Sequence, residues 1–131
     1  MSNPKFDPFT LVEQTILVTG AGGGIGAEIA RQLARAGATV IVHYHRSAEK
    51  AERVVADILD EGHLALAVQA DLSMEGETRG LFDNITARGY HLNGLVNNAA
   101  NMDVCDLKDM SVEQWQQMNR TNIDSAFLTT Q

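Results

Sequence analysis

The sequence contains little of what secreted, membrane-spanning or nucleic-acid-binding proteins use. Cys105 is the single cysteine in 131 residues, which excludes an internal disulfide and leads us to expect a reducing, cytoplasmic location. No apolar run is long enough to cross a bilayer, and the N-terminus lacks the basic and apolar regions of a secretory signal. A formal net charge of -7 argues against a nucleic-acid partner or an anionic membrane surface.

Proline is also scarce, and both prolines, Pro4 and Pro8, lie in a lead-in before Thr15 where they discourage regular structure. We expect the apolar residues of this lead-in to pack against the domain; they are Phe6, Phe9 and Leu11. The remaining sequence has an ordinary apolar content of 44% and no linker or low-complexity tract, so we expect one domain over residues 1–131.

Glycine, in contrast, is concentrated in one stretch. The apolar residues 16–18 are typical of a buried parallel strand. Five glycines then fall within seven positions; they are Gly20, Gly22, Gly23, Gly24 and Gly26. A helical repeat follows, in which Ile25, Ile29 and Leu33 form one apolar face and Gly37 ends the helix. A strand, a glycine turn and a helix in this order predict a dinucleotide-binding unit.

The positions of these glycines have a physical reason. A pyrophosphate must come close to the backbone N–H groups at the start of the helix, where the helix dipole also favours anions. Side chains on Gly20 or Gly24 would block that approach, and Gly26 lets the helix lie close to the strand. A glycine-rich turn without a ligand is the alternative, and the well-formed strand and amphipathic helix around the turn favour binding.

Strand and helix patterns alternate along the rest of the chain. We expect strands at residues 39–44, 64–70 and 94–97 and helices after each, the first capped by Ser47 and stopped by Gly62. Ser111 and Gln114 form a capping box that begins a last helix, with a bend near residues 119–122. Because strand–helix–strand units have right-handed crossovers, this order predicts an α/β fold with a parallel sheet of four strands covered on both faces.

The end of the second strand favours a phosphate ligand. Ligands in such sheets bind at the carboxyl ends of the strands, and a carboxylate here would bind the adenosine ribose and repel a 2′-phosphate. Arg46 occupies this place, between His45 and Ser47, and a guanidinium, a hydroxyl and a helix N-terminus all suit a phosphate dianion. The sequence therefore favours NADP(H) over NAD(H). A solvated Arg46 with Ser47 as a simple cap is the alternative, and a metal pair of His43 and His45 lacks further ligands.

The ends of the third and fourth strands also carry polar residues. Asp71 and Leu72 follow the third strand, and Asn98, Ala99 and Ala100 follow the fourth. On their own these residues are equally typical of turns, in which Asp and Asn bind the nearby backbone.

The stretch TGAGGGIG, residues 19–26, resembles the cofactor motif of the short-chain dehydrogenase/reductase family, and HYHRS, residues 43–47, looks like the segment of pteridine reductases that grips the 2′-phosphate. The resemblance runs from about residue 11 to residue 131 and implies a Rossmann-type doubly wound sheet in three α/β/α layers. It also implies an NADP(H)-dependent oxidoreductase of small carbonyl or alcohol substrates that forms a homo-oligomer.

The resemblance further implies roles for individual residues. Cofactor binding is carried over to Gly20, Gly22, Gly24, Ile25, Gly26, His45, Arg46, Ser47, Asp71, Leu72, Asn98, Ala99 and Ala100. Ala100 departs from the glycine that the family usually has there, which is a mild change because alanine is also small. Asn122 matches the active-site Asn that helps organise a water and the catalytic Lys, although its spacing alone indicates only a polar residue at a helix bend.

The family's later Ser and Tyr-x-x-x-Lys have no counterpart in these residues. Tyr44 and Tyr90 are the only tyrosines, and neither is followed by Lys four residues later. We therefore favour the N-terminal part of a reductase, which alone would be inactive because it lacks the C-terminal catalytic half. The alternatives are a non-catalytic dinucleotide-binding module or regulator, and an S-adenosylmethionine-dependent methyltransferase, which would prefer an acid in place of Arg46.

Overall fold

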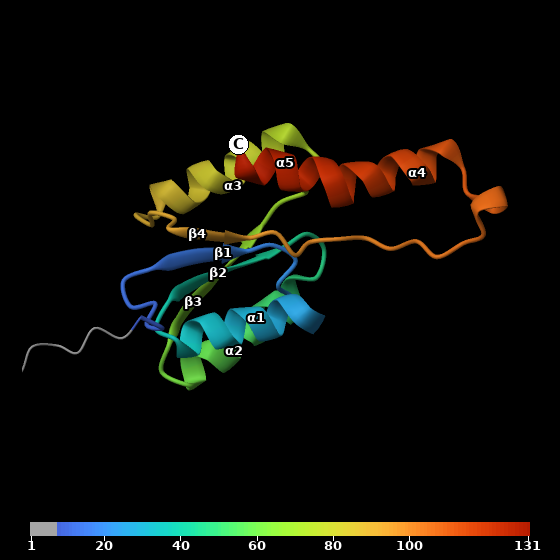
Figure 1. Ribbon diagram of the computed structural model, residues 1–131. Coiled ribbons are helices and arrows are strands. Elements are labelled where there is room, and N and C mark those ends of the chain that lie inside the picture. The colour runs from blue at the N-terminus through green and yellow to red at the C-terminus, as the bar shows by residue number, and fades with distance from the viewer. Residues whose placement is uncertain (1–7) are drawn as a thin grey trace, which may run out of the picture.

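The computed structural model describes residues 8–131, so Pro4 and Phe6 lie outside the described residues. Strands and helices alternate along the chain (Figure 1). The strands are β1 (Thr15–Val18), β2 (Thr39–Tyr44), β3 (Leu64–Gln69) and β4 (Gly94–Val96). The α-helices are α1 (Gly24–Arg35), α2 (Ala48–Asp60), α3 (Glu75–Ala87), α4 (Val112–Asn119) and α5 (Ser125–Thr130).

The four strands form one parallel sheet in the order β3-β2-β1-β4, which confirms the predicted α/β fold. The chain moves outward from β1 through β2 to β3 and then returns to place β4 on the other side of β1. The order of the strands therefore reverses between β1 and β4. In open parallel sheets, a crevice outside the carboxyl ends at such a reversal is where ligands bind.

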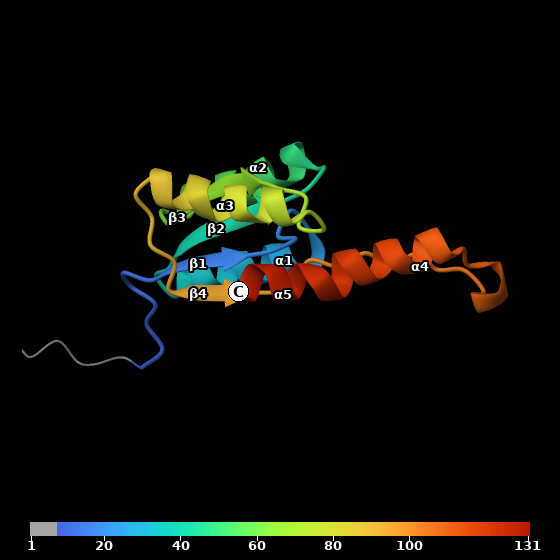
Figure 2. The same cartoon turned by 90° about the horizontal axis from the view of Figure 1, so that it is seen from above.

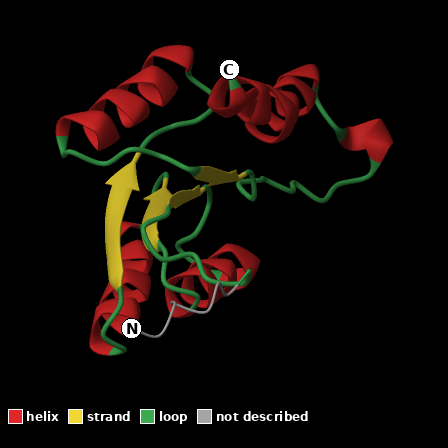
Figure 3. Ribbon diagram, turned by 60° about the vertical axis from the view of Figure 1, so that its left-hand side comes forward, coloured by secondary structure: helices red, strands yellow, loops and turns green. Residues whose placement is uncertain are grey.

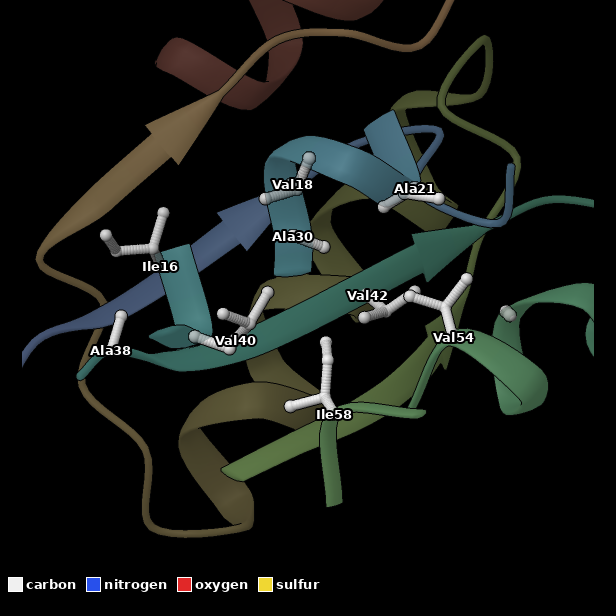
Figure 4. Close-up of a cluster of buried hydrophobic side chains, with 12 residues drawn as sticks. Ile16, Val18, Ala21, Ala30, Ala38, Val40, Val42, Val54 and Ile58 are labelled. Carbon is white, nitrogen blue, oxygen red and sulfur yellow. The ribbon is translucent and has the colours of Figure 1, made fainter. Parts of the chain in front are cut away.

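Helices cover both faces of the sheet, with α1 and α2 on one side and α3 and α5 on the other (Figures 1 and 3). Alternate residues of β1 serve the two layers, because successive side chains of a strand point to opposite faces. Ile16 and Val18 belong to the cluster under α1 and α2 (Figure 4), and Leu17 belongs to the cluster under α3. The sheet is thus apolar on both faces, as the short continuous apolar run of β1 predicts.

Small residues, rather than large ones, form the buried face of α1. Gly26, Ala30 and Ala34 are buried, whereas Ile29 and Leu33 are half-buried and Ile25 is 76% exposed. The prediction that Ile25 shares the buried face is wrong, because the helix lies so close to the glycine loop that only small side chains fit between them.

The lead-in behaves only partly as expected. Leu11 donates a backbone hydrogen bond to the Ala36 carbonyl at 2.8 Å and packs against the core. Phe9 is 84% exposed, so the prediction that it packs into the domain is wrong. The hydrogen bond directs the chain inward at Leu11, two residues beyond Phe9.

The predicted capping box is present in the last helical segment, and where the sequence predicts a bend the helix is locally a π-helix. Ser111 and Gln114 exchange side-chain to backbone hydrogen bonds at the start of α4. A π-helical turn, Arg120–Asp124, then joins α4 to α5. The segment from β4 to α4, which includes a short 3₁₀ turn at Leu107–Asp109, projects beyond the sheet (Figure 2). No helix within residues 8–131 has the length and apolarity needed to cross a membrane.

Candidate functional site at the carboxyl edge of the sheet

A cavity of about 450 Å³ opens where the four strands end. It is lined by Gly20, His43, His45, Arg46, Asp71, Leu72, Ser73, Asn98, Ala99, Ala100, Asn101, Gln117 and Thr121. A second hollow of about 240 Å³ shares Gly20, His45 and Arg46 with it and is also lined by Gly22, Gly23, Tyr44, Ser47 and Lys50. A larger hollow of about 520 Å³ between β3 and α3 contains none of the residues predicted to bind a cofactor. The chemistry of the lining residues, rather than the volume of the cavity, therefore identifies the carboxyl edge of the sheet as the candidate site.

The N-terminus of α1 is electrostatically unlike those of the other long helices. Gly23 is its N-cap and supplies no capping side chain, and its first turn holds no acid. Acidic residues do occupy the first turns of α2, α3 and α4; they are Glu49, Glu75, Glu77 and Glu113. The positive end of the α1 dipole is thus left without a negative side chain, which suits an anionic ligand such as a pyrophosphate.

Two of the glycines are required by close packing. Gly20 has φ of 62°, and a Cβ there would lie 2.8 Å from the Ala99 Cα. A Cβ on Gly26 would collide with the side-chain nitrogen of Asn98 and with the Gly20 carbonyl oxygen. The loop, the start of α1 and the end of β4 therefore pack directly on one another. Gly24 differs, because its φ of 54° favours glycine but no atom lies within 4 Å of a Cβ built there.

Thr19 joins the end of β1 to the residues after β4. Its buried hydroxyl accepts hydrogen bonds of 2.9 Å from the backbone N–H groups of both Asn98 and Ala99. The Asn98 side chain returns two bonds, donating to the carbonyls of Thr19 at 3.0 Å and Gly20 at 3.1 Å. Asn98 is therefore a structural bridge between the glycine loop and β4, and its side-chain nitrogen is already used within the protein.

His43 joins the same loop to β2 and β3. The Gly20 N–H donates to its Nδ1 at 3.0 Å, and its Nε2 lies 3.0 Å from the Ala70 carbonyl oxygen. Burial is the main cause of a pKa below the ordinary value of 6.5 for His43, and it outweighs the opposing effect of the Ala70 carbonyl. The structure thus gives His43 a role in holding the loop, and no group of three or more potential metal ligands occurs among the described residues.

The end of β2 presents exposed polar groups to the cavity. His45, Arg46 and Ser47 are exposed, and within the described part of the chain Arg46 makes no salt bridge. Ser47 occupies the N-cap position of α2, but its side chain makes no capping hydrogen bond, so the prediction of a side-chain cap is wrong. Its backbone, with φ of -101° and ψ of 69°, departs from the geometry that usually aims a capping oxygen at the first turn.

Asp71 faces His45 across the cavity, with 3.6 Å between its Oδ2 and the His45 Nε2. The other carboxylate oxygen accepts bonds from the Ser73 backbone at 3.0 Å and hydroxyl at 2.6 Å, which is the turn-forming role that the sequence also allowed. Partial burial opposes the charge of Asp71, but the Ser73 hydrogen bonds, with His45 and Arg46 nearby, outweigh it and lower the pKa of Asp71. Asp71 is therefore charged at neutral pH. Leu72 beside it is buried and lines the cavity.

Asn122 lies in the π-helical turn and does not itself line the cavity, although its neighbour Thr121 does. Its side chain pairs with the backbone of Asn101, which follows Ala100 at the cavity wall. The structure thus brings thirteen of the fourteen predicted residues to the strand ends and the start of α1, and Leu72 is the one among them at the cavity that is buried. The fourteenth, Asn122, is connected to the cavity wall through Asn101.

Sequence reasoning missed several residues that line the cavities, among them Lys50, Ser73, Gln117 and Thr121. Lys50 could have been found, because it lies in the first turn of the helix that begins directly after Arg46 and Ser47. Gln117 and Thr121 gave no comparable signal, since their approach depends on where α4 folds back.

Comparison with known proteins decides the family. A family model described as short chain dehydrogenase matches residues 14–131. The chain belongs to the short-chain dehydrogenase/reductase family. The four-stranded parallel sheet is therefore the family's Rossmann-like sheet.

Related members of the family agree with this assignment. The chain is 42% identical over 122 residues to the short chain dehydrogenase/reductase nsrJ of Aspergillus novofumigatus, covering 93% of this chain and 46% of that protein. It is similar to a short chain dehydrogenase from Burkholderia cenocepacia solved in complex with NADP, with 35% identity, a TM-score of 0.86 and coverage of 92% and 49%. It is equally similar to the landomycin C-6 ketoreductase LanV solved with NADP and rabelomycin, with 35% identity, a TM-score of 0.86 and coverage of 92% and 52%. The chain thus spans about half the length of the relatives it matches.

Proposed function

We propose that this chain forms the cofactor-binding part of an NADP(H)-dependent oxidoreductase that transfers hydride between the nicotinamide and a small carbonyl or alcohol substrate. The observation that carries the proposal is the convergence of four strand ends on one cavity, beside a helix N-terminus without a negative side chain. Two related structures were solved with NADP, which supports the same cofactor here.

The residues present fit the cofactor by their chemistry. The amides of the glycine loop and the first turn of α1 would hold the pyrophosphate, because Gly23 and Gly24 leave open space there. Arg46, Ser47 and Lys50 would hold the 2′-phosphate as two cations and a hydroxyl in one hollow. His45 would add a further donor beside them.

The other strand ends would hold the adenine and the nicotinamide half. Asp71 and Leu72 would contact the adenine, with a fixed carboxylate and an apolar side chain. Ala99 and Ala100 offer small side chains against the cofactor, and Asn98 sets their position through Thr19. Ile25, exposed in the first turn of α1, would cover the pyrophosphate from the helix side.

When bound, the reduced nicotinamide supplies the hydride. The residues of this chain bind and orient it, and we propose that Asn122 takes part in the active site through the loop at Asn101. The proton donor of the reaction is not among these residues, since neither tyrosine has a Lys four residues later. We also propose that the whole protein works as a homo-oligomer.

A matched pair of glycine variants tests dinucleotide binding. Gly24 and Gly62 both have positive φ, 54° and 84°, and neither has an atom within 4 Å of a built Cβ. Alanine at either position therefore costs a similar strain of about 1 kcal/mol. In the intact protein, Gly24→Ala should weaken NADPH binding by calorimetry at least ten-fold, while Gly62→Ala should leave it unchanged. Equal affinities for the two variants would contradict the proposed site.

A further inference from the structure

His43 is the point at which the glycine loop is attached to the middle of the sheet. Two successive loop amides donate to it: the Gly20 N–H to the imidazole Nδ1 at 3.0 Å and the Ala21 N–H to the carbonyl oxygen at 2.9 Å. The opposite ring nitrogen lies 3.0 Å from the Ala70 carbonyl, at the end of β3. The side chain is 2% exposed, so water does not replace these partners.

These contacts require one protonation state of the imidazole. An amide N–H can only donate and a carbonyl oxygen can only accept, so Nδ1 carries the lone pair and Nε2 carries the hydrogen. The ring is therefore neutral. A second proton, on Nδ1, would face the Gly20 N–H and remove its acceptor.

We propose that His43 is a positioning residue for the cofactor: its neutral ring holds the Gly20 peptide in place, and protonation releases the loop and weakens dinucleotide binding. This inference rests on the proposed function. His43 touches the loop backbone and acts on the cofactor only through it. Because apparent affinity falls with the fraction of protein whose loop is competent, loosening the loop raises the measured Kd.

The surroundings of His43 set the direction of the pH dependence. Burial, the largest effect, lowers the pKa of His43, and the nearby His45 lowers it further. The Ala70 carbonyl and Asp71 raise it, and the resulting pKa lies below 6.5. Arg46 lines the same cavity, and the first turn of α1 brings no acid. Since the folded protein favours the neutral ring, the stabilising effect is complete above the ordinary pKa of 6.5 and is lost as pH falls toward the lower pKa of the folded state.

Two variants distinguish the effect of the ring's hydrogen bond with Gly20 from that of its hydrogen bond with Ala70. In His43→Asn, the amide oxygen takes the place of Nδ1 and still accepts from Gly20, and it does not titrate. In His43→Gln, the longer amide reaches toward Ala70 and leaves the Gly20 N–H without an acceptor. At about pH 7.5, NADPH affinity of the intact protein should fall at least ten-fold in His43→Gln and less than about three-fold in His43→Asn.

The pH profile is read as the ratio of the Kd of the parent to that of His43→Asn. Both proteins contain His45 and bind the same ligand, so titration of His45 and of the 2′-phosphate cancels. This ratio should be constant above the ordinary pKa of 6.5 and should rise as the pH is lowered below it toward the lower pKa of His43 in the folded protein. Without ligand, long-range ¹H–¹⁵N spectra should show the hydrogen of His43 on Nε2, and Gly20 amide exchange should be faster in His43→Gln than in the parent.

Each contrary result has its own meaning. Equal Kd values for the two variants, a ratio that does not change with pH, or a hydrogen on Nδ1 would overturn the inference alone. A parent protein that binds no dinucleotide at any pH would overturn the proposed function and the inference with it.

Discussion

The side-chain amide of Asn122 and the backbone of Asn101 are joined by two hydrogen bonds of 2.7 Å. Asn122 accepts from the Asn101 N–H and donates to the Asn101 carbonyl, so both ends of its amide are used. The pair closes the loop between β4 and α4 across 21 residues of sequence. The side chain of Asn122 therefore shapes the wall of the cavity through Asn101.

We expect Asn122→Ala to loosen the Asn101 loop and to lower kcat of the intact protein roughly ten- to one hundred-fold, because small displacements at a reacting centre have large effects. Asn122→Asp should do the same, since a carboxylate can accept from the Asn101 N–H but cannot donate to its carbonyl. Amide exchange at Asn101 and steady-state kinetics measure the two effects.

Asn119→Ala is the matched control for Asn122. Its side chain also bonds to backbone, donating to the Trp115 carbonyl at 2.9 Å, but it lines neither cavity at the strand ends. It should leave kcat and Asn101 exchange unchanged. Normal kcat in Asn122→Ala would show that Asn122 has no part in the reaction.

Thr19 supports the site through its buried hydroxyl, so Thr19→Val should destabilise the protein. The substitution leaves the amides of Asn98 and Ala99 without their acceptor, at a cost of about 2–4 kcal/mol for the pair. Urea unfolding measures the free energy. Thr19→Ser keeps the oxygen and should cost under about 1 kcal/mol; equal losses for Val and Ser would assign the effect to packing instead.

The apolar surface of α4 and α5 predicts association of residues 1–131 when they are expressed alone. Trp115, Ile123 and Phe127 are 57%, 61% and 64% exposed, and β4 pairs only with β1 in the described sheet. Light scattering over a concentration series should show oligomers or aggregates, and Phe127→Ser should reduce them.

Leu64 at the opposite edge of the sheet provides the comparison, because it is also 64% exposed. Leu64→Ser should leave the association unchanged. A stable monomer whose Leu95 and Val96 amides are strongly protected from exchange would refute the prediction, since the β4 edge would then be covered.

The parallel sheet and the position of the site follow from local signals, because short apolar runs, glycines and helix caps act within a few residues. His43 shows where such reasoning stops: its partners at Gly20 and Ala70 lie 23 and 27 residues away and become neighbours only through strand pairing. Ile25 fits the helical repeat but is exposed, since close packing of α1 selects small residues. Ser47 is a residue type that often caps a helix with its side chain, but the backbone conformation at Ser47 does not aim its hydroxyl at the first turn of α2.

A direct comparison of NADPH and NADH binding by calorimetry tests the central claim, that Arg46 and its neighbours hold a 2′-phosphate at the carboxyl edge of the sheet. The intact protein should bind NADPH more tightly than NADH. Arg46→Glu should reduce NADPH affinity about ten- to one hundred-fold, the value of one charge-assisted contact, and change NADH affinity little. Arg53→Glu, which reverses the same charge at an α2 side chain paired with Glu49 outside both cavities, should change neither. Equal affinities for the two cofactors in the parent protein, unaffected by Arg46→Glu, would contradict the account.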